Sequence, residues 1–217
     1  MTNERPQYAI ATSPEQRKQV YSLRYECYRR KGSIGESAGG EFSDAFDERP
    51  NNFSFLVTRQ KEALATVRIS VVRSDLGWTD SPVQHVYGDH PAFQEIARTS
   101  YVESSRLCFG GQARRDCFVG LVGHMAALAE FYEVEWLVAC PRVEHAQAYQ
   151  RMFGFAALAA PRRYFGVSFE TQLLGIRVAG LREYVRERRP MVAAWSAALA
   201  GLLASPPVAI SDPFRYA

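Results

Sequence analysis

The sequence has few of the residues that build disulfides or metal sites. Among its 217 residues are four cysteines and four histidines. No two cysteines form a CxxC pair, which favours reduced core thiols in a cytoplasmic protein. The histidines show no HxH or HExxH spacing, so we expect no metal site.

Long apolar runs are also scarce. Residues 1–7 contain no apolar core, so we expect no signal peptide. The strongly apolar run 191–204 is shorter than the roughly 20 residues that a helix needs to span a bilayer. This run predicts a packing helix, and a peripheral contact with a membrane or a contact between copies of the chain is the alternative.

Neither sign of charge is in large excess. The formal net charge is +3, which gives no reason to expect binding to nucleic acid. Basic residues nevertheless cluster at positions 29–31, 114–115, 162–163 and 186–189. One such cluster is typical of a solvated surface, but several together favour an acidic partner.

The predicted elements follow the order of an α/β protein. A capping box at Ser13 and Gln16, with Pro14 between them, starts a helix that ends near Gly32. Further helices are expected at 91–97, 116–132, 143–153 and 181–203, the last interrupted at Pro190. Strands are expected at 8–11, at 53–59 and 63–72 as a hairpin that turns at 60–62, and at 101–109, 136–140, 155–160 and 164–178. We therefore predict a mixed central sheet flanked by helices, in one domain covering residues 1–217 with a C-terminal helical extension at about 181–204.

Charged residues recur in segments that otherwise have the pattern of buried elements. Arg68 interrupts an apolar strand, and Glu103 and Arg106 fall within another. Burying a charge costs several kcal/mol unless it is paired. The segment 33–52 has no periodicity, and loops of this length are usually functional or mobile. We therefore expect one catalytic site formed by Arg24, Asp44, Asp47, Arg68, Glu103 and Arg106.

The strand at 101–109 carries two charges whose spacing conflicts with simple alternation. Strict alternation would place Glu103 and Arg106 on opposite faces. One extra residue near Ser104 and Ser105 would bring both charges to one side and free a backbone N–H group, so we predict a β-bulge there. Glu103 is the candidate general base, and the alternative is a structural ion pair between Glu103 and Arg106.

The second half of the chain resembles a known superfamily. A helical pattern follows Arg115, an apolar strand is expected from Trp136, and the next helix closes on Phe153, Gly154 and Phe155. In this order and these motifs the chain resembles the GCN5-related N-acyltransferase superfamily. The resemblance implies that fold and the transfer of an acyl group from a thioester to an amine.

The first half narrows the resemblance. The residues that carry it are Arg24, Tyr28, Asp44, Asp47, Arg68, Glu103 and Arg106. Their order and spacing are similar to those of the acyl-homoserine-lactone (autoinducer) synthases and the N-acyl amino acid synthases, which generally take long acyl chains from acyl carrier protein. The autoinducer synthases tend to carry a tryptophan before the two aspartates. None lies between Tyr28 and Asp44, which favours the amino acid synthases.

The resemblance also suggests roles for these residues. Asp44 and Asp47 would meet the positively charged amine, with Arg24 ordering their loop. The alternative is that both aspartates only turn the chain. A covalent route through Cys108 or Cys117 is disfavoured, because no histidine is near either in the sequence.

The segment before position 116 bears on the acyl donor. Gly110 and Gly111 precede a helix whose first N–H groups suit a phosphate, unless the glycines only turn the chain. The superfamily's coenzyme A loop has the form Arg/Gln-x-x-Gly-x-Gly/Ala, and Phe118 stands at its first glycine. This bulk would crowd a pyrophosphate, so the phosphopantetheine of acyl carrier protein is favoured over coenzyme A. The predicted binding residues are Phe109, Gly110, Gly111, Arg114 and Arg115.

The resemblance therefore implies an N-acyl amino acid synthase that needs no bound cofactor. The alternatives are an autoinducer synthase that uses S-adenosylmethionine and a non-catalytic acyl-binding module. The acidic carrier protein would dock on the basic residues at 29–31 and 114–115. The candidates for an apolar tunnel around the acyl chain are Phe109, Leu121, Met125, Leu137 and Phe153.

Overall fold

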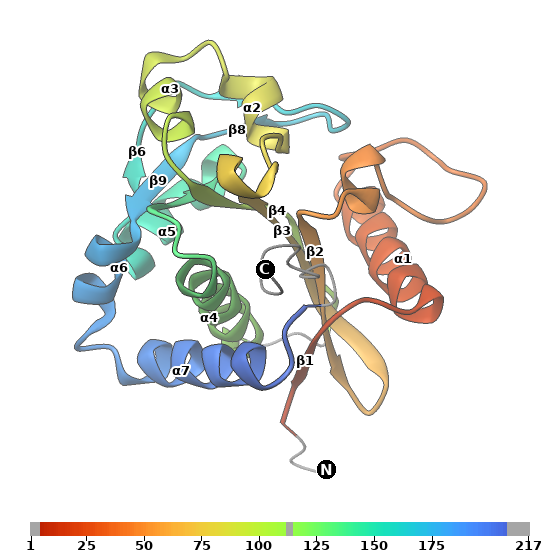
Figure 1. Cartoon of the computed structure of the whole chain (residues 1–217). Helices are drawn as coiled ribbons and strands as arrows, with labels where there is room; N and C mark the ends of the chain where they lie inside the picture. The colour runs from red at the N-terminus through yellow and green to blue at the C-terminus, as the bar shows by residue number, and fades with distance from the viewer. Residues whose placement is uncertain (1–4, 112–114, 208–217) are drawn as a thin grey trace.

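A seven-stranded mixed sheet forms the centre of the computed structural model, which describes residues 5–111 and 115–207 (Figure 1). Its strands are β1 (Gln7–Ile10), β2 (Asn52–Arg59), β3 (Glu62–Val72), β4 (Tyr101–Phe109), β5 (Trp136–Ala139), β6 (Ala156–Ala157) and β9 (Leu174–Arg177). They lie in the order β1-β2-β3-β4-β5-β9-β6, with β4 and β5 parallel and the other neighbours antiparallel. A separate pair is formed by β7 (Arg162–Arg163) and β8 (Glu170–Thr171).

Helices cover both faces of the sheet, as the sequence predicts. The α-helices are α1 (Pro14–Arg30), α2 (Pro82–Tyr87), α3 (Pro91–Ala97), α4 (Arg115–Phe131), α5 (Val143–Phe153), α6 (Val178–Val185) and α7 (Arg189–Ala204). α1 lies on one face of the sheet, and α4 and α7 lie on the other (Figure 1). The sequence pattern does not predict α2, which is only 6 residues long.

The capping box predicted for α1 is present. The Ser13 hydroxyl accepts a hydrogen bond from the Gln16 N–H group, and the Gln16 side chain accepts one from the Ser13 N–H group, both at 3.2 Å. Val20, Arg24 and Cys27 then follow about one turn apart, and all three are buried. The inner face of α1 therefore brings one arginine to the sheet.

The turn of the β2–β3 hairpin lies where the sequence predicts it. Gln60 and Lys61 have φ angles of 50° and 67°. Positive φ at both central residues is the geometry of the two-residue turns whose twist matches that of a hairpin. The hairpin sets Ser54 of β2 directly opposite Arg68 of β3.

The sheet splits along one edge of β4 and is irregular along the other. β4 pairs with β5 only as far as Ser104 and Ala139. On the side of β3, Arg106 and Leu107 of β4 lie opposite Val67 alone. Arg106 has φ 55°, a conformation that residues other than glycine seldom adopt. The predicted bulge is confirmed, and it lies immediately after the predicted position.

The strand predicted at 164–178 is confirmed only in its second half. Only β8 and β9 are strands in this segment, and residues 164–169 form a loop. Gly166 has φ 72°, which an extended strand does not allow. Tyr164 and Val167 are buried, so side chains that favour strands pack here from an irregular backbone. The strand predicted at 155–160 is likewise reduced to β6.

The apolar run 191–204 lies within α7, which packs against α4 as the sequence predicts. The two backbones approach closely, because a Cβ atom added at Gly123 of α4 would lie 2.9 Å from the carbonyl carbon of Ala194. Pro190 in the first turn of α7 divides the predicted C-terminal helix into α6 and α7. No helix within residues 5–111 and 115–207 is long and apolar enough to cross a membrane.

The contact between α4 and α7 can be tested with a matched pair of glycine variants. Gly123→Leu should lower the free energy of unfolding by roughly 1–3 kcal/mol, because the side chain overpacks against the backbone of α7. Gly201→Leu is the control, since an added Cβ atom there meets nothing within 4 Å. Urea denaturation measures both, and equal midpoints for the two variants would contradict this packing.

Candidate active site

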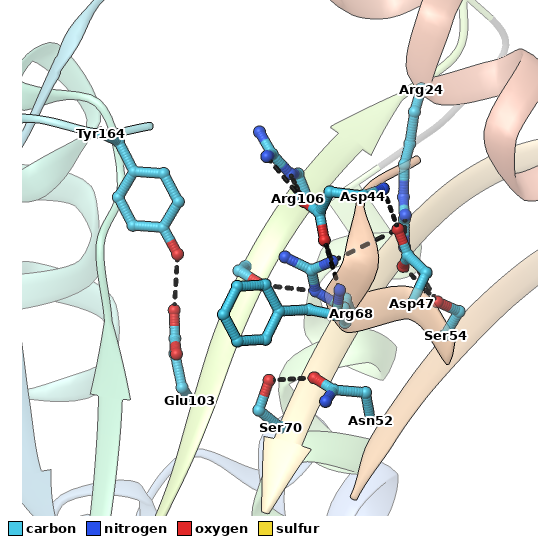
Figure 2. A network of polar contacts seen from close by, with 12 residues as sticks. Arg24, Asp44, Asp47, Asn52, Ser54, Arg68, Ser70, Glu103, Arg106 and Tyr164 are labelled. Atoms are coloured by element: carbon cyan, nitrogen blue, oxygen red, sulfur yellow. Dashed lines mark hydrogen bonds and ion pairs between the residues drawn. The ribbon is translucent and has the colours of Figure 1, made fainter. Parts of the chain in front are cut away.

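Of the six predicted charged residues, all but Glu103 converge between α1 and the sheet (Figure 2). Arg24 donates from Nη1 to Oδ1 of Asp47 at 2.7 Å and from Nη2 to the hydroxyl of Ser54 at 2.9 Å. The side chains of Arg24 and Asp47 are 0% and 1% exposed, so this ion pair is isolated from solvent. α1 supplies the arginine and the hairpin supplies the hydroxyl.

Asp44 bridges two further arginines. Its Oδ1 lies 2.5 Å from Nη1 of Arg68, and its Oδ2 lies 2.8 Å from Nη2 and 3.2 Å from Nε of Arg106. Nη1 of Arg68 also lies 3.3 Å from Oδ2 of Asp47, and Nε of Arg68 donates to the hydroxyl of Ser105. Four segments far apart in the sequence therefore form one network.

A short 3-10 helix, Ala45–Glu48, holds the two aspartates in place. The Asp44 side chain accepts the N–H group of Phe46 at 3.0 Å, and Oδ2 of Asp47 accepts the N–H group of Asp44 at 3.0 Å. The same carboxylates turn the chain and pair with the arginines, so the alternative that they only turn the chain is wrong. Their contact with the amine stays a prediction. The Arg68 guanidinium also lies over the Phe46 ring, 5.5 Å from its centroid.

The network contains three arginines and two aspartates, so positive charge is in excess by one. Desolvation alone would raise the pKa of Asp44, but the charges and hydrogen bonds of Arg68 and Arg106 outweigh it and lower this pKa to about 2. Nη2 of Arg68 is buried without a hydrogen-bond partner. Asp44 is thus ionised at neutral pH, and the arginines of the network outnumber its two carboxylates.

Glu103 has a different environment. It is fully buried, and it accepts hydrogen bonds from the Val83 N–H group at 2.9 Å and the Tyr164 hydroxyl at 2.8 Å. Burial raises the pKa of Glu103, although these two hydrogen bonds and the charge of Arg68 oppose the shift. The alternative of a structural ion pair with Arg106 does not fit, because Arg106 pairs with Asp44. Glu103 is therefore the titratable carboxylate of the site.

Tyr164 is the site residue that the sequence pattern misses. It bonds to Glu103, and the Arg106 guanidinium lies 5.9 Å from the centroid of its ring. Glu103 and Arg106 therefore lie on the same side of β4, as the bulge predicts. Phe165 stacks on Tyr164, and an added Cβ atom at Gly166 would lie 3.4 Å from Arg106. The one local feature of the sequence that marks Tyr164 is a run of aromatic residues around a glycine.

A cavity of about 470 Å³ opens in the split between β4 and β5. Its wall along β4 runs from Ser104 to Phe109 and includes Arg106, and Tyr28 of α1 lines the opposite side. Two basic residues, Lys31 and Arg142, also line it. This space lies directly against the arginine network and next to the bulge.

The predicted phosphopantetheine residues are only partly placed. Phe109 lines the cavity. The Gly110 N–H group bonds to the Leu64 carbonyl at 2.8 Å, and an added Cβ atom would lie 3.3 Å from that oxygen, so Gly110 serves to keep the chain close to β3. Gly111 has open space around it. Arg114 lies outside the described residues, and of Arg115 only the backbone, at the start of α4, is described.

A second cavity of about 810 Å³ adjoins the first. Tyr164 and the rest of the loop at 164–168 line it, and Ser33 lines both cavities. Two hydrogen bonds hold the loop beside Ser33: the Ser168 N–H group donates to the Ser33 carbonyl and the Ser168 hydroxyl to the Gly32 carbonyl. The two spaces therefore adjoin at Ser33, with Arg106 in the wall of one and Tyr164, the partner of Glu103, in the wall of the other.

The candidates for an acyl tunnel divide between cavity walls and the core. Phe109 lines the cavity at the split, and Phe153 lines a cavity on the other side of α4. Leu121, Met125 and Leu137 are at most 4% exposed and belong to the main hydrophobic core. Periodicity marks such residues as buried, but it does not tell a filled core from a hollow one.

The comparisons with known proteins agree with this geometry. Residues 19–177 match the family described as N-acyl amino acid synthase FeeM. The solved structure of FeeM, from uncultured soil microbes, has a TM-score of 0.69 at 17% identity and covers 82% of this chain and 94% of that chain. No curated protein matches the sequence.

Two autoinducer synthases also resemble this chain in structure. LasI has a TM-score of 0.58 at 13% identity, covering 80% of this chain and 90% of its own. The coenzyme A-dependent acyl-homoserine lactone synthase BjaI has a TM-score of 0.57 at 12% identity, covering 88% and 87%. The fold is therefore that of the GCN5-related N-acyltransferases. The chain belongs to the family of the N-acyl amino acid synthase FeeM, and it is an acyltransferase.

The ion pairs of Asp44 should make the free energy of unfolding depend on pH in acid. Because the pKa of Asp44 is lowered from 3.8 to about 2, the carboxylate stabilises the fold above about pH 4, and this contribution of about 2 kcal/mol disappears as the pH falls toward 2. Asp44→Asn should be less stable at neutral pH and lose less stability in acid. The control Glu62→Gln changes an exposed carboxylate.

Urea denaturation at a series of pH values measures these differences. A parallel loss of stability in acid for the wild type and Asp44→Asn would contradict the role of the two arginines.

Proposed function

We propose that this acyltransferase is an N-acyl amino acid synthase. It moves a long acyl chain from the thioester of acyl carrier protein to the α-amine of an amino acid. The observation that carries the proposal is the buried carboxylate of Glu103, held by Tyr164 beside a β-bulge at the split between β4 and β5. The family match over residues 19–177 supports it.

The reaction requires a free amine and a polarised thioester. The amine nitrogen attacks the thioester carbon, the nitrogen gives up a proton to Glu103, and the C–S bond then breaks to release the pantetheine thiol, which takes the proton. Burial raises the pKa of Glu103, which makes it a stronger base than an exposed carboxylate. Because a thioester is already activated, no covalent intermediate on the enzyme is needed.

The oxyanion of the tetrahedral intermediate would lie at the bulge. Arg106 and Leu107 are out of register with β3, and β4 has left β5 at this point. Backbone N–H groups that point into such a gap are suitable oxyanion donors. The excess positive charge of the arginine network adds a favourable potential at the same place.

The two cavities suit the two substrates. The thioester would occupy the cavity at the split, and the amino acid would enter through the cavity lined by Tyr164. The two cavities adjoin at Ser33, whose hydroxyl accepts a hydrogen bond from Arg142 at 2.6 Å. The alternative is an autoinducer synthase, in which S-adenosylmethionine would take the place of the amino acid.

Mass spectrometry of the products tests this function. The purified protein is incubated with acyl carrier protein or coenzyme A thioesters and with a mixture of amino acids or S-adenosylmethionine. We expect N-acyl amino acids, formed faster from the carrier protein. Acyl-homoserine lactone as the product would favour the alternative, and no product with any donor or acceptor would reject both.

The base is tested by the pH dependence of the rate. Glu103→Gln should lower kcat by roughly 10²–10⁴-fold. Tyr164→Phe removes a hydrogen bond that lowers the pKa of Glu103, so the acid limb of kcat/KM should move to higher pH in this variant. An unchanged acid limb in Tyr164→Phe would argue against Glu103 as the base.

Docking of the carrier protein is proposed at the basic rim of the cavity. Lys31 lines this cavity, and Arg30 precedes it at the end of α1. Reversing both to glutamate should raise KM for an acylated carrier protein, most strongly at low salt, and leave turnover of a short pantetheine thioester unchanged. Lys18→Glu, exposed near the start of α1, is the control. Equal kinetics in all three proteins would rule out this face.

A further inference from the structure

A cavity larger than the two at the site lies outside it. It has a volume of about 1420 Å³ and lies between β1, β2, α4 and α7. Apolar side chains dominate its lining, including Ile10, Phe55, Met191 and Leu202. Its charged lining residues, Arg151, Glu187 and Arg188, are exposed, so they lie toward solvent. Such a space suits an aliphatic ligand.

One layer of aromatic rings separates this space from the cavity at the split. Phe118 lines the cavity at the split, and Phe153 lines the large one. Their ring centroids are 5.3 Å apart. The next residues on α4 after Phe118, Val119 and Gly120, already line the large cavity. The two spaces are therefore neighbours on either side of the first turns of α4.

Contacts with three other aromatic rings surround Phe118 in this layer. Phe118 meets the edges or faces of Phe109, Tyr149 and Phe153, with centroids 5.3–5.9 Å apart. Phe118 is partly exposed to its cavity, whereas Phe153 is fully buried. A rotation of Phe118 breaks no hydrogen bond or ion pair, because phenylalanine makes none. It is therefore the ring of this layer that can most readily move aside.

Two walls of the large cavity come from segments outside the family match. β1 and α7 lie before and after residues 19–177. α7 contributes Ala194, Ala197, Ala198 and Gly201, small residues that leave the space open. The large cavity is thus bounded by parts of the chain that the family pattern does not include.

We propose that the large cavity holds the distal part of a long aliphatic acyl chain, with Phe118 as the side chain that opens the way from the thioester. This assignment rests on the proposed function, because the thioester end lies in the cavity at the split. Each methylene that leaves water for this apolar lining makes the free energy of binding more favourable. The cavity would therefore favour long acyl chains over short ones.

Filling the cavity from α7 tests the proposal without touching the site. At Gly201 an added Cβ atom meets nothing within 4 Å, so Gly201→Phe places a ring in the cavity without a clash at the helix. Ala200→Phe is the matched control, because Ala200 is exposed and does not line the cavity. Thermal unfolding of each variant checks that the fold is kept.

The kinetic readout is the dependence on chain length. We expect Gly201→Phe to lower kcat/KM for a hexadecanoyl thioester by at least about tenfold and to leave an octanoyl thioester unchanged, because only the distal methylenes lose their place. Ala200→Phe should match the wild type with both. A wild-type chain-length profile in Gly201→Phe would overturn the proposal.

A second readout does not depend on turnover. Hexadecanoyl-pantetheine with a diazirine at the end of the acyl chain is photolysed with the whole protein, and labelled peptides are identified by mass spectrometry. The proposal is supported by label on residues 189–204 under one condition. Hexadecanoyl-pantetheine must displace this label, and octanoyl-pantetheine must not. Label confined to residues that line the cavity at the split overturns it.

The two readouts separate this proposal from the proposed function. Label on α7 without any product would leave the acyl site standing and reject the synthase. Product with every chain length and no label on α7 would reject the acyl site in the large cavity and leave the synthase standing. Competition by free hexadecanoate but not by hexadecanoyl-pantetheine would indicate an independent lipid site and overturn the continuity between the two cavities.

Discussion

The buried ion pairs of Asp44 and Asp47 with three arginines are the interaction on which this site depends. Arg24 and Arg68 are completely buried, and a buried charge without a partner costs several kcal/mol. The aspartates come from a short helix that they also cap. The same contacts therefore fix the loop, hold α1 to the hairpin and create a positive potential at the bulge. Local structure and site electrostatics cannot be separated here.

The carboxylates of Asp44 and Glu103 have opposite pKa shifts, because only Asp44 is paired directly with arginines. Asp44 meets guanidinium groups directly, which lowers its pKa. Glu103 meets an amide N–H group and a hydroxyl, and its burial raises its pKa. One group thus remains an anion and the other can exchange a proton. This separation of roles within one cleft is a common arrangement for acid–base catalysis.

The β-bulge and the split of the sheet give β4 its double role. Up to Ser104 the strand has partners on both sides and belongs to the core. Beyond it, the strand faces a cavity on one edge and is out of register on the other. The bulge brings Arg106 to the side of Glu103, where Tyr164 contacts both. On the far side of α4, small residues of α7 form one wall of the large cavity.

The sequence by itself determined much of this structure, because caps, turns and alternation are local. Ser13 and Gln16 start α1, and the spacing of Glu103 and Arg106 predicts the bulge. Charges within apolar segments also identify the site. Only the tertiary structure decided which charges pair, since Asp44 rather than Glu103 neutralises Arg106. It likewise decided that Tyr164 lies in a buried loop instead of a strand, and where the cavities are. Such contacts join residues far apart in the chain, and they leave no periodic signal near either partner.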